Sequence, residues 1–213
     1  MGKLNFGITG QVRGSVNNLT FAVSKGINYV KQKATSVANP RTLAQRIQRN
    51  RFTAILRIFQ QIPSVVNKGF VGAYAHMSEY SAFMKVNIIP ATVLGSGDDV
   101  NVKYSDLKLS QGSLQPTPIS GILATGGDND VEISFSTYTL GSQESSDLAY
   151  AIAFNETTQK WSAPNGDVLR SAGEITVSFE DNCTTNDIIR AYLFFVGASN
   201  GKISNSQNSD LIV

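Results

Sequence analysis

The sequence predicts an α+β fold in which an N-terminal arm and a small helical region precede an antiparallel β-sandwich. Residues 1–38 are rich in glycine and alternate apolar with polar side chains, which is typical of extended chain and hairpins. Residues 39–90 place apolar side chains at helical spacing. Residues 91–213 contain short alternating segments between polar turns, as in immunoglobulin-like or fibronectin-like sandwiches. We therefore expect three domains: an extended arm with a β-hairpin, a basic helical region and an acidic immunoglobulin-like β-sandwich.

Size and composition indicate a folded protein. The 213 residues are enough to bury a core, and 41% hydrophobic with 16% charged residues is typical of a globular chain. The single cysteine, Cys183, excludes an intramolecular disulfide and a cysteine metal cluster. No apolar run approaches the ~20 residues of a membrane span, so we expect synthesis in the cytoplasm and no membrane partner.

Charge is divided unevenly along the chain. Residues 1–90 carry twelve Lys or Arg and one acid, Glu79, for a net charge of +11. Residues 91–213 carry six Lys or Arg and fifteen acids, for a net charge of −9. Opposite ends of such a molecule attract each other's copies, or the basic end attracts another anionic partner. The alternative is that the division only keeps the protein in solution.

The N-terminal arm is expected to be extended. Glycines at positions 2, 7, 10 and 14 oppose a stable helix. Two alternating runs then flank a Lys25-Gly26 turn and predict a β-hairpin: Leu19, Phe21 and Val23 before the turn, and Ile27, Tyr29 and Lys31 after it. An isolated hairpin is marginally stable in water. It must pack on its own chain or extend a sheet of another subunit, and the sequence leaves both open.

A basic helix is predicted to start at Asn39-Pro40, with asparagine as the N-cap and proline at the first helical position. Its expected buried stripe has Phe52 beside it and consists of Leu43, Ile47, Ile55, Leu56, Phe59 and Ile62. Five arginines occupy much of the remainder, namely Arg41, Arg46, Arg49, Arg51 and Arg57. The helix contains no acidic residue through Gln61, so no intrahelical ion pair relieves their repulsion. We expect an external anion, either nucleic-acid phosphate or an acidic face of a neighbouring subunit, with a solvated face as the alternative.

The rest of the helical region is expected to form its small core. Ile62-Pro63 ends or kinks the first helix, an apolar segment over residues 65–74 follows, and Ser78-Glu79 is typical of a helix cap. His76 is the only histidine, so neither a histidine metal site nor histidine-based catalysis is expected.

Seven strands are predicted in the third domain. They are Leu107–Leu109, Ile119–Ala124, Asp130–Phe135, Leu148–Asn155, Glu174–Phe179, Ile188–Val196 and Ser209–Val213. Trp161 and Tyr192 are the aromatic residues expected at the core or its rim. No catalytic constellation is apparent, so we expect no enzyme, no cofactor and no small-molecule substrate.

The N-terminal motifs resemble a known family. The relevant residues are Gly10-Gln11-Val12-Arg13-Gly14, Phe21 to Val30, Asn39-Pro40-Arg41-Thr42, Ala44-Gln45, Arg49 and Arg51-Phe52. They are similar to a poorly characterised domain family of Bacteroidota and their tailed phages, including crAss-like phages. Its pattern contains G-x-x-G, an apolar hairpin ending in Arg or Lys, and N-P-x-T-x-A-Q-x-x-x-R. The resemblance covers about the first 90 residues. Lys31 departs from it, because the hairpin is expected to carry arginine there.

This resemblance implies a non-enzymatic structural protein of a tailed-phage virion, made in the host bacterial cytoplasm. A head-to-tail ring or connector and a capsid-decorating protein are the expected roles, with other copies of the chain and other virion proteins as partners. The expected partner-binding residues are Arg41, Arg46, Arg49, Arg51, Arg57, Phe21 and Tyr29. The alternative is a cytoplasmic nucleic-acid-binding module in which the same arginines contact phosphate.

Overall fold

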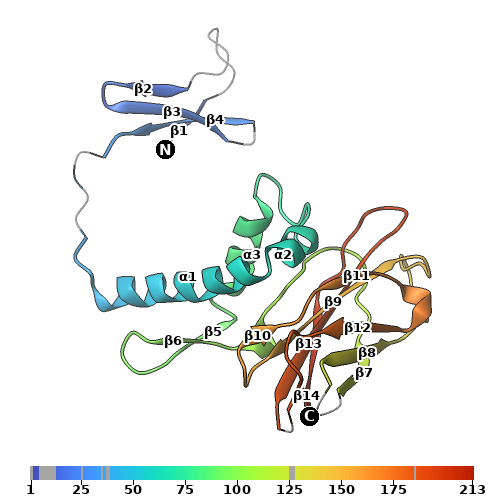
Figure 1. Cartoon of the computed structure of the whole chain (residues 1–213). Helices are drawn as coiled ribbons and strands as arrows, with labels where there is room; N and C mark the ends of the chain where they lie inside the picture. The colour runs from blue at the N-terminus through green and yellow to red at the C-terminus, as the bar shows by residue number, and fades with distance from the viewer. Residues whose placement is uncertain are drawn as a thin grey trace. The chain divides into compact units, whose positions relative to one another are not determined.

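The computed structural model describes residues 2–4, 13–24, 26–34, 36, 39–124, 128–184 and 186–213. The chain forms two compact units, Met1–Thr42 and Leu43–Val213 (Figure 1). The predicted boundary near residue 90 falls inside the second unit, because the helices and the following strands share one hydrophobic core. Gly7 and Gly10 of the predicted arm lie outside the described residues.

The first unit is a four-stranded antiparallel sheet with strand order β1-β4-β3-β2. Its strands are β1 (Gly2–Leu4), β2 (Gly14–Val16), β3 (Leu19–Ser24) and β4 (Ile27–Gln32). The predicted hairpin is confirmed as β3 and β4, with Gly26 at a φ of +79° in the turn. Glycine adopts this left-handed conformation without steric cost, since it lacks a Cβ atom.

Three helices open the second unit: α1 (Leu43–Gln61), α2 (Pro63–Gly69) and α3 (Glu79–Asn87). The predicted start of α1 at Asn39-Pro40 is wrong. Arg41 has a φ of +50°, outside the right-handed helical region, so the helix begins only after it. Thr42 then precedes the first helical residue, with Gln45 three positions on, which is the capping-box spacing.

The breaks between the helices follow the predicted signals. Pro63 is the first residue of α2, where the missing N–H of proline has no cost. Ser78 caps α3, since its side chain accepts a hydrogen bond from the Ser81 backbone N–H over 3.2 Å. Both signals are local, which is why the sequence alone was sufficient to locate them.

The remaining strands form three antiparallel sheets. The central sheet has the order β10-β9-β13-β14, with β11 also paired to β9, and a second sheet has the order β12-β8-β7. The strands of these two sheets are β7 (Ile119–Ala124), β8 (Asp130–Phe135), β9 (Leu148–Asn155), β10 (Lys160–Trp161), β11 (Asn165–Leu169), β12 (Glu174–Ser178), β13 (Ile188–Val196) and β14 (Gln207–Ile212). A separate hairpin pairs β5 (Thr92–Leu94) with β6 (Val100–Val102).

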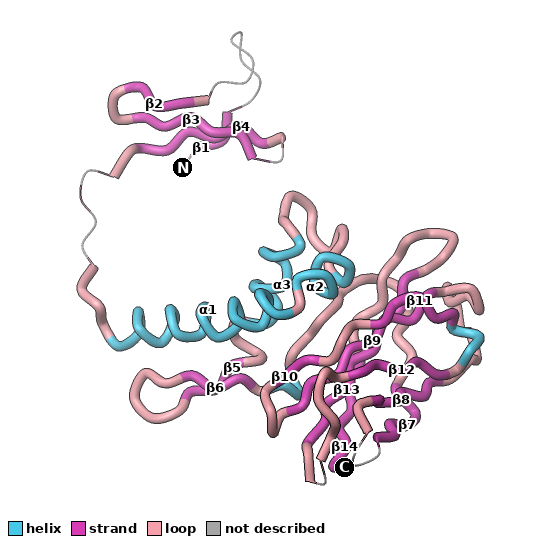
Figure 2. The backbone as a smooth tube through the Cα atoms, in the orientation of Figure 1, coloured by secondary structure: helices cyan, strands magenta, loops and turns pink. Residues whose placement is uncertain are grey.

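Both faces of the central sheet are buried, which gives the second unit three layers (Figure 2). On β13, Leu193 and Phe195 belong to the core shared with the three-stranded sheet, whereas Tyr192 and Phe194 belong to the core shared with the helices. Strand β9 places its alanines in the core shared with the three-stranded sheet, and Ile152 and Phe154 in the core shared with the helices. The fold is therefore α+β, as predicted.

The predicted strand Leu107–Leu109 is wrong. Both leucines are buried, but the backbone N–H of Leu109 donates to Ser206 Oγ over 3.0 Å and that of Lys108 to Asn87 Oδ1 over 2.8 Å. The side chains of Asn87 and Ser206 therefore accept hydrogen bonds that, in a strand, these backbone N–H groups would donate to a neighbouring strand. The short strands β5, β6, β10 and β11 were not predicted, because none of them has a long alternating pattern.

A buried ion pair crosses this unit. The Arg170 side chain is completely buried, and its Nη2 lies 3.3 Å from Asp147 Oδ2. Its guanidinium carbon lies 3.8 Å from the ring centroid of Phe195, and Nη1 donates to the Thr117 hydroxyl. Asp147 also accepts a hydrogen bond from the backbone N–H of Glu144 over 2.9 Å. The pair thus fixes the loop before β9 beside the end of β11.

We expect Arg170→Ala to lower the free energy of unfolding by about 3–5 kcal/mol, because it leaves the Asp147 carboxylate buried without its cation. Urea unfolding followed by circular dichroism measures the change. Lys160→Ala is the matched control, since its ion pair with Asp181 is solvent-exposed and we expect no measurable effect. Equal losses in the two variants would contradict the assignment of Arg170 as a buried support.

A second buried carboxylate, Asp187, closes the loop before β13. Its side chain is 1% exposed and accepts hydrogen bonds from the Thr184 backbone N–H over 2.8 Å and from Asn155 Nδ2 over 2.9 Å. Burial raises the pKa of the Asp187 carboxyl, but the hydrogen bonds from Thr184 and Asn155 outweigh burial, so its pKa is lowered.

Because the pKa of Asp187 is lower in the folded chain, its contribution to stability is present above the unfolded-state pKa of about 4 and is lost as the pH falls through the folded value. We therefore expect the free energy of unfolding to decrease below about pH 4. Asp187→Asn should flatten this decrease, whereas Asp99→Asn, at an exposed turn, should not. Urea unfolding measured at several pH values between about pH 2 and pH 6 gives the comparison. If the free energy of unfolding of Asp187→Asn decreases with falling pH as steeply as that of the wild type, the prediction is refuted.

Candidate functional site

Helix α1 lies against the β5–β6 hairpin (Figure 1). Arg46 Nε donates to Asp98 Oδ2 over 2.8 Å, and Asn50 Nδ2 donates to the Asp98 backbone oxygen over 2.8 Å. Residues of the first turn of α1 include no acid, so the helix dipole and the arginines add positive charge at the same end. Asp98, in the turn of the β5–β6 hairpin, thus supplies one of the negative charges that α1 itself lacks.

The five predicted arginines do not form one face. Arg51 lies on the stripe that continues through Ile55 and Ile58, at intervals of four and three residues, and it is half-buried. Its Nε atom is buried and has no hydrogen-bond partner among the described residues. Arg46 forms an ion pair with Asp98, and Arg41, Arg46, Arg49 and Arg57 are all exposed. Arg51 therefore lies apart from Arg46, Arg49 and Arg57, which are on the exposed side of the helix.

The predicted apolar stripe of α1 is only partly correct. Ile55 and Ile62 are buried, and so is Ile58, which the sequence pattern did not single out. Leu43 remains 51% exposed and Phe52 41% exposed. The physical reason is that only the second half of α1 contacts the core shared with α2, α3 and the central sheet.

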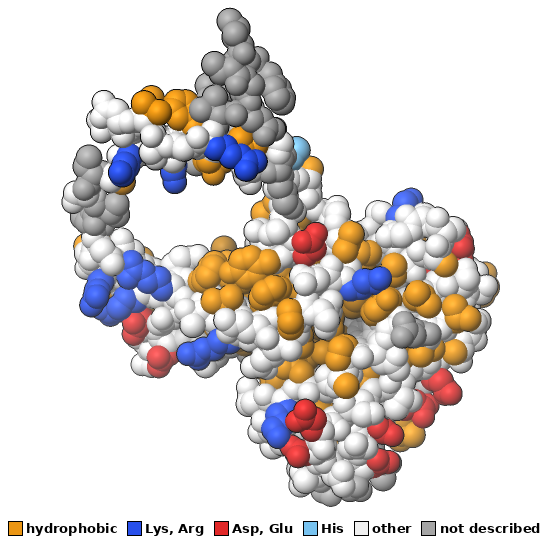
Figure 3. Space-filling view, turned by 45° about the horizontal axis from the view of Figure 1, so that its top comes forward, with side chains coloured by type: hydrophobic (Ala, Val, Ile, Leu, Met, Phe, Trp, Pro, Cys, Tyr) orange, Lys and Arg blue, Asp and Glu red, His pale blue; other side chains and the backbone are white. Residues whose placement is uncertain are grey.

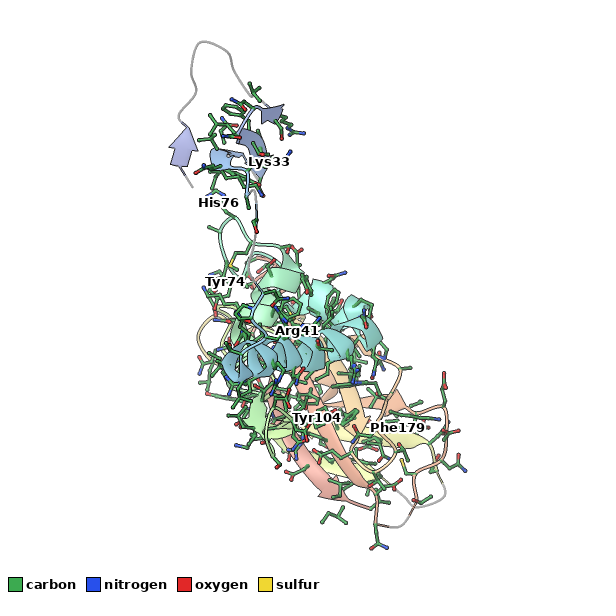
Figure 4. All side chains as sticks on the ribbon, turned by 90° about the vertical axis from the view of Figure 1, so that its left-hand side faces the viewer. Lys33, Arg41, Tyr74, His76, Tyr104 and Phe179 are labelled. Carbon is green, nitrogen blue, oxygen red and sulfur yellow. The ribbon has the colours of Figure 1, made fainter. Side chains whose placement is uncertain are left out.

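A cavity of about 410 Å³ lies between α1, β6 and the turn after β9. Its lining includes Arg57, Phe154 and Tyr104, and Figure 4 shows Tyr104 on the side of α1 that faces the strands. The ring of Tyr104 stacks on Phe154 with a centroid distance of 4.1 Å, and its hydroxyl donates to Gln159 Oε1 over 3.3 Å. Burial, together with the nearby carboxylate of Glu156, raises the pKa of the Tyr104 hydroxyl. It therefore remains a neutral hydrogen-bond donor.

The predicted contact residues Phe21 and Tyr29 lie on opposite faces of the N-terminal sheet. Ser24 pairs with Ile27 across a two-residue turn, so Phe21 pairs with Val30 and Tyr29 pairs with Ala22. Residues directly opposite in an antiparallel pair share a face. One face therefore carries the group that we call the apolar sheet face: Val16, Leu19, Phe21, Val23 and Val30.

The first unit has no hydrophobic core among its described residues. None of its described hydrophobic side chains is buried, and Val16 and Leu19 are 66% and 45% exposed. A sheet normally buries at least one face against another layer. The alternation of β3 and β4 was visible in the sequence, but which residues share a face depends on the turn length, which sets the register.

The described residues show no assembled metal or histidine site. No group of three His, Cys, Asp or Glu side chains among them is placed to hold a metal ion. His76 is exposed in the loop between α2 and α3. Cys183 is buried, and burial together with the carboxylates of Asp187 and Asp128 raises the pKa of its thiol. Of the described helices, none is both long and apolar enough to cross a membrane.

Comparison with known proteins identifies a family. A model described as a family of unknown function, DUF6266, matches residues 10–209, so the chain belongs to this family. The match covers most of the chain, from the N-terminal sheet to the last strand. No curated protein matches the sequence.

Among solved structures, a family 76 glycoside hydrolase from a bovine Bacteroides thetaiotaomicron strain is similar to this chain at 11% identity and a TM-score of 0.33. The match covers 46% of this chain and 20% of that one. A likeness this weak carries no argument about fold or activity.

We expect the Arg46–Asp98 ion pair to show a coupling energy of about 0.2–1 kcal/mol, because both side chains are in contact with solvent, at 50% and 38% exposure. A double-mutant cycle with Arg46→Ala and Asp98→Ala, measured by urea unfolding, gives this value. The cycle of Arg57→Ala with Asp98→Ala is the matched control and should show no coupling. Coupling in the control alone would mean that the hairpin pairs with a different arginine in solution.

Proposed function

We propose that this member of the DUF6266 family is a non-enzymatic structural protein of a tailed-phage virion, either a head-to-tail ring or connector or a capsid-decorating protein. The observation that carries the proposal is the N-terminal sheet, which exposes an apolar face and buries no described hydrophobic side chain of its own. Such an element gains stability by packing on another surface. The virion location follows from the family resemblance of the N-terminal motifs to proteins of tailed phages.

The division of charge between the two units supports an assembly role. Residues 1–42 carry six Lys or Arg and no acid, whereas residues 43–213 carry twelve Lys or Arg and sixteen acids. The net charges are therefore +6 and −4. Neighbouring copies in a ring or lattice attract each other when such opposite ends meet.

We also propose an immunoglobulin-like arrangement for the two larger sheets. The order β12-β8-β7 corresponds to strands E, B and A, and the order β9-β13-β14 corresponds to strands C, F and G. This assignment supports the prediction made from strand spacing. It leaves the helices against the outer face of the C-F-G sheet, a layer that immunoglobulin domains do not require.

A nucleic-acid-binding module is the second candidate. The exposed arginines Arg41, Arg49 and Arg57 favour it, since arginine binds phosphate through bidentate hydrogen bonds. Two observations weigh against it: Arg46 is paired with Asp98, and Arg51 lies on the core-facing stripe of α1. Assembly through the N-terminal unit therefore has the stronger support.

We expect the protein to be present in purified particles of a phage that encodes it, at a fixed ratio to the major capsid protein. Quantitative mass spectrometry of gradient-purified particles measures this ratio, with a non-virion protein of the same phage as control. Absence from the particles would refute the proposal. If the protein is absent from the particles and its affinity for DNA falls steeply between low and high salt, the nucleic-acid alternative is supported.

A further inference from the structure

A groove runs between α1 and strand β6 in the second unit. Two hollows of about 410 Å³ and about 200 Å³ lie along it, and both are lined by Ala54, Arg57 and Val100, so the two are continuous. Its wall on α1 extends from Asn50 to Gln61, which is about 16 Å at the helical rise of about 1.5 Å per residue. An extended chain rises about 3.3 Å per residue, so the groove has the length of about five residues of extended peptide.

The β6 side of the groove is the edge of a strand. Val100, Asn101 and Val102 all line the larger hollow. Side chains alternate between the two faces of a strand, so three consecutive residues line one hollow when the edge of the strand borders it. Among the described strands, β6 pairs only with β5, so its other edge has no strand beside it.

The backbone groups of Val100 and Val102 point to this unpaired edge. The Lys103 N–H donates to the Ala91 carbonyl oxygen over 2.9 Å, so these two residues form a hydrogen-bonded pair of the hairpin. Such pairs alternate along an antiparallel ladder with pairs that exchange no hydrogen bond. Val102 and Val100, one and three positions before Lys103, therefore direct their N–H and C=O groups away from β5, where a further strand can bind them.

Arg57 places a positive charge at the centre of the groove. Its side chain is exposed and lines both hollows, and the described part of the chain provides no ion pair or hydrogen bond for it. The acidic residue Asp99 lines only the smaller hollow, beside the hairpin turn. Figure 3 shows basic and acidic side chains together at the end of the second unit that carries the start of α1 and this hairpin. A peptide with an acidic residue at its centre and a basic residue at one end complements these charges.

The inner end of the groove is held in place before any partner binds. Tyr104, which stacks on Phe154, donates its hydroxyl hydrogen bond to Gln159, and Gln159 Nε2 in turn donates to the Glu156 backbone oxygen over 2.7 Å. These three lining side chains are therefore fixed by contacts within the chain. A preformed site loses little side-chain freedom when a ligand binds.

We infer that this groove binds an extended peptide segment of a partner protein as a third strand beside β6, with an acidic side chain of the segment bound to Arg57. Main-chain hydrogen bonds to Val100 and Val102 supply affinity, and the charges of Arg57 and Asp99 select the sequence of the peptide. The inference goes beyond the proposed function, because it assigns a peptide-binding site to the second unit, whereas the proposed assembly surface lies in the first.

The test uses the full-length protein labelled with nitrogen-15 and a capped five-residue peptide with the sequence lysine, valine, glutamate, valine, threonine. Binding shifts the NMR amide resonances of Val100 and Val102 and slows their hydrogen exchange. Two further peptides carry N-methyl groups on alternate backbone nitrogens, one on the odd and one on the even positions. Only one edge of a bound strand faces β6, so one of the two peptides loses binding and the other retains it. Equal binding of the two overturns the inference.

Charge recognition is tested with Arg57→Gln, which weakens binding of the peptide about fivefold, as expected for one solvent-exposed ion pair. Replacing the glutamate of the peptide by glutamine weakens binding to the wild type equally and has no further effect on Arg57→Gln. Arg49→Gln is the matched control, because Arg49 is an exposed arginine of the same helix but lines neither hollow. It binds the peptide as the wild type does.

Two other results overturn the inference. Acetylglutamate amide that binds as tightly as the peptide shows a carboxylate site only, and a peptide that shifts no resonance of β6 at millimolar concentration shows that the edge does not accept a strand. Neither result affects the proposed function, which depends on the presence of the protein in purified particles. Absence from particles, in turn, leaves measured peptide binding unaffected.

Discussion

The fold of the larger unit depends on a central sheet that is buried on both faces. Strand β9 directs alanines toward the three-stranded sheet and larger side chains toward the helices, and Tyr192 and Phe194 of β13 face the helices beside them. Small residues allow the two sheets to approach closely, whereas the large ones fill the wider space beneath the helices. The helices and this sheet therefore share one hydrophobic core within the compact unit Leu43–Val213.

The basic helix α1 is accommodated by two different environments. Its second half is anchored by Ile55, Ile58 and Ile62 in the core, so its position does not depend on the arginines. Its first half has few buried contacts and is held to the β5–β6 hairpin through Asp98. The positive charge of α1, for which the sequence predicted an external anion, is thus partly balanced by Asp98 of the same chain.

The N-terminal sheet has the opposite character. It has regular strands and a clear apolar face, yet its described residues bury no hydrophobic side chain. Hydrophobic burial is the main favourable contribution to folding, and the described residues of this sheet lack that contribution. This is the observation on which the proposed assembly role rests.

The sequence by itself determined the local features of this protein: the hairpin at Gly26, the cap at Ser78, the break at Pro63, most of the strands and the separation of charge. These depend on backbone preferences and short-range periodicity, which neighbouring residues encode. The tertiary structure alone decided which residues meet. The Arg46–Asp98 and Arg170–Asp147 pairs join residues distant in sequence, and the start of α1 was set by the left-handed backbone of Arg41. The register set by the turn pairs Phe21 with Val30 and Ala22 with Tyr29, so Phe21 and Tyr29 lie on opposite faces of the N-terminal sheet. The alternation in the sequence shows which residues of one strand share a face, but only the register shows which residues of two strands do.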